Sequence, residues 1–104
     1  MPQGDTRSEH SLERALCRAV QECGGLCLKM PADLYLGIPD RLVLLPGGRG
    51  YFVELKRLGG RLSKPQARFL LRLDRMGYNV RVVEGTTEVN NLIKDIRKRS
   101  RYTR

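Results

Sequence analysis

The sequence predicts an α/β domain in which helices flank a mixed four-stranded sheet. Three short, strand-like apolar segments follow a first amphipathic stretch, and a second amphipathic stretch separates them from a fourth such segment. A third amphipathic stretch comes last, so the expected order is helix, three strands, helix, strand, helix. Elements in this order pack as layers around one core. The 104 residues suffice for a single domain over 1–104, and we find no internal repeat.

The first element expected is a helix from Ser8, after a loose leader over residues 1–7. Apolar residues recur at the spacing of one helix face, and Gly24-Gly25 ends the pattern. The residues of this face are Leu12, Ala15, Leu16, Ala19, Val20 and Cys23.

Three strands are expected next. The first spans residues 25–30, and a loop over 31–39 separates it from a continuously apolar strand over 41–45, as in the interior of a sheet. A glycine-rich turn over 46–50 then leads into a strand over 51–56. The second and third strands should therefore form an antiparallel hairpin.

The remaining elements are a helix over 63–76, which Gly77 ends, a strand over 79–84, and a helix from Thr87 to about Lys98. One face of the last helix is apolar, and this face either covers the sheet of its own chain or extends a dimer interface. Its residues are Val89, Leu92, Ile93 and Ile96.

The charge favours a polyanionic partner, because 20 Lys and Arg face 11 Asp and Glu, for a net charge of +9. Nucleic acid is the first expectation and an anionic membrane surface the second. A basic tail over 99–104 either is solvated or contacts phosphates. The sequence has no apolar run of membrane-spanning length and no signal peptide, so we expect a cytoplasmic protein without a membrane segment.

The three cysteines, Cys17, Cys23 and Cys27, cannot all pair within one chain, which fits a reducing compartment. Cys23 and Cys27 together with His10 form a weak zinc pattern, but there is no C-x-x-C. Buried, reduced thiols are the preferred interpretation.

An acidic and a basic residue, Glu54 and Lys56, interrupt an otherwise apolar strand. Side chains two residues apart point to the same face, so the alternate residues Tyr51, Val53 and Leu55 should pack inward. A surface ion pair on an exposed sheet face would give the same local pattern.

Asp40 changes this interpretation. It lies directly before the preceding strand, and a hairpin would bring it near Glu54. Pro39 restricts the backbone there, and Gly37 allows a tight turn. Two neighbouring carboxylates repel unless a cation lies between them, and Mg²⁺ prefers oxygen ligands. A metal-bound water loses its proton more readily. Lys56 would orient this water and neutralise negative charge in the transition state.

Taken together, these residues resemble the PD-(D/E)xK nuclease motif, and the fuller pattern resembles its VRR-NUC branch, the virus-type replication-repair nucleases. The resemblance runs from Glu9 to about Glu88, and the small size is similar to stand-alone members from phages and bacteria. The matching residues are Glu9, Glu13, Gly24-Gly25, Lys29, Gly37-Ile38-Pro39-Asp40-Arg41, Phe52-Val53-Glu54-Leu55-Lys56, Gly60-Arg61-Leu62-Ser63 and Gln66.

The resemblance implies a restriction-endonuclease-like core and a Mg²⁺- or Mn²⁺-dependent endodeoxyribonuclease that selects DNA by structure, with four-way junctions among its substrates. Asp40, Glu54 and the backbone carbonyl of Leu55 would hold the metal, and Lys56 would be catalytic. Gln66 and a glutamate of the first helix would support them. The implied setting is the cytoplasm of a bacterium or phage-infected cell.

Two supporting residues have alternative interpretations. Glu9 and Glu13 share a helix face; Glu13 borders the apolar stripe and is the preferred site glutamate, against a solvated pairing with nearby arginines. Ser63-x-x-Gln66 also fits a capping box, which is compatible with catalysis because a helix N-terminus attracts phosphate.

Five cations are candidate DNA contacts: Lys29, Arg41, Arg57, Arg61 and Lys64. Lys29 could instead lie along a strand edge with its amine in water. The expected partners are branched DNA and a second copy of the chain in a C₂ homodimer. A non-catalytic nucleic-acid-binding module is the alternative, but acidic residues in a phosphate groove would weaken binding unless a metal offsets them.

Overall fold

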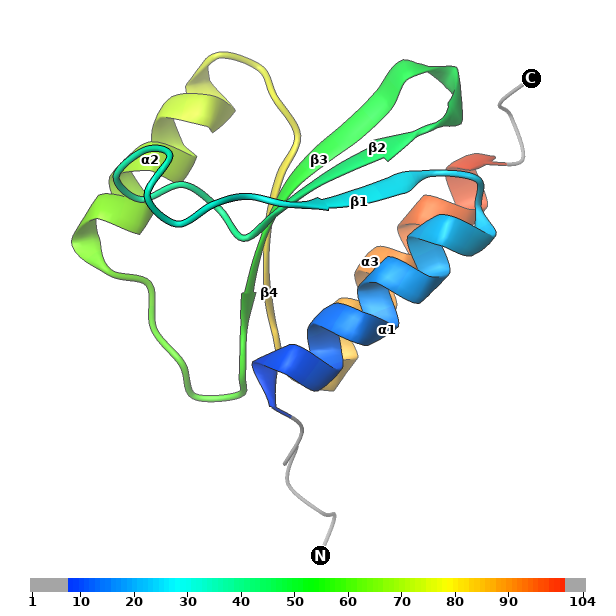
Figure 1. The fold of residues 1–104 in the computed structure, drawn as a ribbon, viewed down its shortest axis with the longest axis horizontal. Coiled ribbons are helices and arrows are strands. Elements are labelled where there is room, and N and C mark those ends of the chain that lie inside the picture. Colours follow the sequence, from blue (N-terminus) through cyan, green and yellow to red (C-terminus); the bar gives the residue numbers. More distant parts are fainter. Residues whose placement is uncertain (1–7, 101–104) are drawn as a thin grey trace, which may run out of the picture.

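A computed structural model describes residues 8–100, and it confirms the predicted α/β architecture and element order (Figure 1). The leader over 1–7 and the end of the basic tail lie outside the described residues. The elements are α1 (Glu9–Glu22), β1 (Leu26–Lys29), β2 (Arg41–Leu45), a short 3₁₀ turn (Pro46–Gly48), β3 (Arg49–Lys56), α2 (Lys64–Arg75), β4 (Val80–Glu84) and α3 (Gly85–Ser100).

The sheet has the order β1-β2-β3-β4. The first two pairs are antiparallel, as the predicted hairpin requires, and α2 forms the crossover to β4, which is parallel to β3. The helices α1 and α3 lie side by side on one face of the sheet (Figure 1). The other face carries Glu54, which contacts α2, so the domain has a helix layer on each side.

The core lies between the sheet and the α1–α3 pair. Tyr51, Val53 and Leu55 are at most 5% exposed and pack inward, as predicted from their alternation with Glu54 and Lys56. The apolar face of α3 is part of the same core, and its four residues are at most 9% exposed. That face therefore covers the sheet of its own chain, and the alternative in which it extends a dimer interface is wrong.

Local signals in the sequence fix the helix starts. The Ser8 hydroxyl caps α1 by accepting a hydrogen bond from the Ser11 N–H. Ser63 and Gln66 form the predicted capping box at α2. The last helix begins at Gly85, two residues before the predicted start, and the Glu88 carboxylate accepts the Glu84 N–H at 2.7 Å.

The cysteines are free thiols, and each is half-buried rather than fully buried. Burial raises the pKa of the Cys27 thiol to about 12, and a hydrogen bond with Cys17 contributes. The neutral thiol is therefore strongly favoured at this position.

Candidate active site

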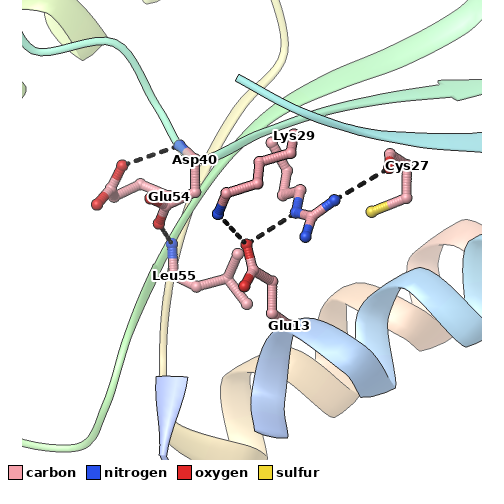
Figure 2. A network of polar contacts seen from close by, with 7 residues as sticks. Glu13, Cys27, Lys29, Asp40, Glu54 and Leu55 are labelled. Atoms are coloured by element: carbon pink, nitrogen blue, oxygen red, sulfur yellow. Dashed lines mark hydrogen bonds and ion pairs between the residues drawn. The ribbon is translucent and has the colours of Figure 1, made fainter. Parts of the chain in front are cut away.

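The antiparallel pairing of β2 and β3 places Asp40 beside Glu54. Asp40 directly precedes β2, whose first residue, Arg41, pairs with Val53 of β3. The Asp40 N–H donates to Glu54 Oε1 at 3.2 Å, and the Leu55 N–H donates to Asp40 Oδ2 at 3.0 Å (Figure 2). The carboxylate of Glu54 is therefore held by the backbone of Asp40, and the carboxylate of Asp40 by the backbone of the residue after Glu54.

Glu54 is an acid in a nearly water-free position, with 1% of its surface exposed. Burial raises the pKa of its carboxyl to about 7, the negative charge of Asp40 acts in the same direction, and Lys56 opposes both. The alternative of a surface ion pair on an exposed sheet face is therefore wrong for this strand.

Lys56 and Gln66 converge on one oxygen of Glu54. The Lys56 Nζ lies 3.3 Å from Glu54 Oε2, and the Gln66 Nε2 donates to the same oxygen at 3.0 Å. The Gln66 Oε1 meanwhile accepts the Ser63 N–H at 2.8 Å. Capping and the site contact are thus combined in one side chain.

Glu13 reaches the sheet from α1, whereas Glu9 is exposed. Glu13 Oε2 lies 2.8 Å from Arg41 Nε and 3.7 Å from Lys29 Nζ, and Arg41 also donates to the Cys27 carbonyl at 3.2 Å (Figure 2). Glu13 is therefore linked to the carboxylate pair through Arg41, the residue after Asp40.

The five predicted DNA-contacting cations differ in exposure. Lys29 keeps 69% of its side chain in solvent, and Arg57, Arg61 and Lys64 are exposed. Arg41 has only 17% of its side chain exposed. Burial alone would lower the pKa of its guanidinium, but the hydrogen bond and charge of Glu13 outweigh burial and raise it. Arg41 is therefore the least exposed of the five, and its contact with DNA stays a prediction.

The carboxylate pair has the donor chemistry of a hard divalent cation. Asp40 and Glu54 offer only oxygen atoms, which suit Mg²⁺ or Mn²⁺. Burial is the main reason why the pKa of Glu54 is raised, and the charge of Asp40 adds to it; a cation between the two acids would remove this repulsion. Among the described residues, no three His, Cys, Asp or Glu side chains gather as a metal site. A backbone carbonyl such as that of Leu55 and water would therefore complete the ligand set.

The profile of the VRR-NUC domain matches residues 5–87, which include every residue of this site. The chain belongs to the VRR-NUC family. A curated relative, "Putative nuclease p44" of Acyrthosiphon pisum secondary endosymbiont phage 1, is 38% identical over 76 residues, which are 73% of this chain and 82% of the relative.

Solved structures agree with this VRR-NUC assignment. One described as "VRR_NUC domain" is 30% identical with a TM-score of 0.77, covering 85% of this chain and 97% of its own. Another, a "VRR_NUC domain protein", is 18% identical with a TM-score of 0.70, covering 92% and 91%, and shows the fold alone. The chain is a nuclease, so the non-catalytic binding module that the charge left open is set aside.

One contact beside this VRR-NUC site was not predicted from the sequence, that of Glu84 with the loop after Lys56. Its Oε2 accepts the Gly59 N–H at 2.6 Å, which ties down the loop after Lys56. The available signal was its position at the end of β4, in register with Lys56.

Over the described residues, every helix is too short or too polar to cross a membrane.

Proposed function

We propose that this VRR-NUC domain is a Mg²⁺- or Mn²⁺-dependent DNA endonuclease with Asp40, Glu54 and the Leu55 carbonyl as metal ligands. The observation that carries the proposal is the pairing of Asp40 with Glu54, with Lys56 Nζ 3.3 Å from the second carboxylate. A buried, repelling pair of acids would be costly to keep if nothing offset the charge.

The site residues divide the work of phosphodiester hydrolysis. A bound divalent ion would supply a Lewis acid that acidifies water and neutralises charge on the phosphate. Lys56 Nζ orients the attacking water and stabilises negative charge as the bond from phosphorus to the leaving oxygen breaks. Gln66 holds Glu54 Oε2 and keeps that carboxylate facing the reaction. Glu13 supports the site by fixing Arg41.

The DNA backbone follows the exposed cations near the site. Lys29 lies on β1, Arg57 and Arg61 lie in the loop after Lys56, and Lys64 begins α2. The net charge of +9 supports an anionic substrate, and the α2 N-terminus adds the positive end of a helix dipole.

Branched DNA and a C₂ homodimer complete the proposal. One such site cuts one strand, and two sites related by a two-fold axis match the symmetry of a four-way junction. An apolar area on the sheet face away from α1 and α3 supports a dimer, because Leu26, Leu28 and Leu44 are 58%, 41% and 39% exposed. With a phage protein among its relatives, we place this activity in the cytoplasm of a bacterial or phage-infected cell.

The test is cleavage of labelled linear, flapped and four-way DNAs with Mg²⁺, Mn²⁺ or chelator. Asp40→Asn and Glu54→Gln should abolish cutting and weaken Mn²⁺ binding in calorimetry. Lys56→Ala should cut at least about 100-fold more slowly at saturating DNA, as for loss of a transition-state contact. Glu22→Gln is the matched acid-to-amide control, because Glu22 pairs with Arg97 far from the site.

Three results would contradict the proposal: cutting in the presence of chelator, Mn²⁺ affinity unchanged in both carboxylate variants, or equal loss of activity in Glu22→Gln. Equal cutting of linear duplex and junction would remove the preference for branched DNA and leave the metal chemistry in place.

A further inference from the structure

A cavity of about 450 Å³ opens directly beside the carboxylate pair, between the 31–39 loop and the start of α2. Asp40 and Gln66 of the site form part of its wall, and the rest is mainly apolar, with Met30, Leu36 and Pro65 among the lining residues. A molecule in this cavity, which we call the loop pocket, would lie next to the reacting phosphate. The volume falls within the range of roughly 300–1,000 Å³ that is typical of small-ligand sites.

A second hollow of about 480 Å³ shares Leu36 and Pro65 with the loop pocket. Its other walls include Tyr35 and the α2 residues Arg68 and Arg72. The two hollows therefore form one surface that runs from the site along α2, divided by the side chains of Leu36 and Pro65.

Three consecutive apolar residues are exposed at this surface. Leu34, Tyr35 and Leu36 are 59%, 52% and 73% exposed. A contiguous run of exposed apolar residues beside a cavity is typical of a binding surface, because exposing such residues to water is unfavourable.

The 31–39 loop is held in one shape although its tip is exposed. The Leu34 and Ile38 N–H groups donate to the carbonyls of Pro31 and Tyr35 at 3.0 and 3.1 Å. The Tyr35 ring lies 5.1 Å from the ring of Phe69 on α2. The loop thus presents its leucines from a fixed backbone, which lowers the entropy cost of binding.

The charged side chains of this surface are mainly basic. Lys29 lines the loop pocket and Arg68 and Arg72 line the second hollow, and all three are exposed; the one acid in the two linings is Asp40. A ligand that complements this surface is anionic along its backbone and offers flat apolar faces.

We propose that the surface formed by the loop pocket and the second hollow binds an unpaired nucleotide of the DNA substrate, with its base against Leu36 and Tyr35 and its phosphate toward Lys29, Arg68 and Arg72. The inference rests on the proposed function, because it needs DNA at the carboxylate pair. In a duplex the base faces are covered by stacking. A duplex would therefore contact the cations but leave the apolar side chains of this surface exposed to solvent. Only an unpaired base exposes the face that aromatic and apolar side chains bind. The substrate therefore carries unpaired nucleotides beside the cut phosphate, as at a flap, a gap or an opened branch point.

The experiment measures binding, in EDTA, so that cleavage plays no part. Fluorescence anisotropy gives Kd for a blunt duplex, for the same duplex with a 5′ or a 3′ single-stranded extension, and for extensions built from abasic nucleotides. Wild type should prefer one extension over the blunt duplex by about 5-fold to 100-fold, the range expected from one stacked base. The abasic extension should lose this preference.

The variant Tyr35→Ala/Leu36→Ser should bind the blunt duplex as wild type does but show no preference for the extension. Leu71→Ser is the matched control, because Leu71 is 47% exposed on α2 and lines neither hollow. The inference is overturned if wild type shows no preference, if the abasic extension keeps it, or if both variants lose it equally. A preserved binding preference in a protein that fails the metal and cleavage tests would overturn the proposed function but still support binding of an unpaired nucleotide at this surface.

Discussion

Glu54 ionises at a cost because it is buried and because Asp40 lies beside it. Its pKa is about 7 in the folded protein, against about 4.3 in an unfolded chain. Between these values the folded state retains a proton that the unfolded state has released. The free energy of unfolding of the metal-free protein therefore falls as pH rises from about 4.3 to about 7 and is then level with respect to this group.

Glu54→Gln should remove that pH dependence, because the amide is neutral throughout. In urea unfolding with chelator, the variant should become more stable than wild type as pH rises from 5 to 7, by on the order of 1–3 kcal/mol. Added Mn²⁺ should stabilise wild type more than the variant. Parallel pH profiles for the two proteins would show that the fold does not strain this carboxylate.

The sequence predicted the contacts of Asp40, Glu54 and Lys56 because strand alternation and hairpin register are local properties. It could not predict where Arg41 points, since its partner Glu13 is 28 positions away on α1. The same holds for Gln66: the capping box is local, but the contact with Glu54 depends on how α2 packs. Tertiary placement thus gives Arg41 a contact with Glu13 that the sequence did not predict, and its DNA contact stays a prediction.

At the scale of elements, periodicity and glycine positions predicted all seven helices and strands among the described residues, in order. The 31–39 segment was correctly expected as a loop, but its shape comes from α2 rather than from its own sequence. Gly37 has φ +84°, and a Cβ built there would stand 2.3 Å from the Pro65 carbonyl oxygen. Only glycine allows the loop to approach α2 this closely.

Gly37→Ala and Gly59→Ala form a matched pair that isolates this approach. Both glycines have φ near +85°, but nothing lies within 4 Å of a Cβ at Gly59. Gly59→Ala should lower the free energy of unfolding by about 1 kcal/mol, the conformational cost alone. Gly37→Ala should lower it by roughly 1–3 kcal/mol more and reduce DNA cleavage. If thermal or urea unfolding shows the same loss of stability for both variants, the loop can move away from α2 at no measurable cost.

At the scale of the whole molecule, the two sheet faces are covered unequally. Two helices cover the core face, whereas α2 leaves an apolar area of β1 and β2 open on the other. The exposed leucines of that area can extend an interface, whereas the α3 face cannot because it is internal.

Light scattering at micromolar concentration should therefore give about twice the chain mass of 11.9 kDa. Leu28→Lys should shift the mass to that of one chain, because a buried lysine in a two-fold interface meets its own copy or apolar surface. Leu71→Lys is the matched control, because it makes the same exchange at an exposed leucine of α2, and this variant should remain at twice the mass. A single-chain mass for wild type would reject the dimer.

The ends of the described chain lie at opposite ends of the sheet (Figure 1). Glu13, near the start of α1, holds the residue after Asp40, whereas Arg97, near the end of α3, pairs with Glu22 at the far end of α1. A targeting module fused upstream of α1 would consequently be tethered beside the cutting centre. A module fused downstream would need a linker that runs back along the 16 residues of α3, a distance of roughly 24 Å. Fusion upstream of α1 therefore gives the shorter connection between a targeting module and the cutting centre.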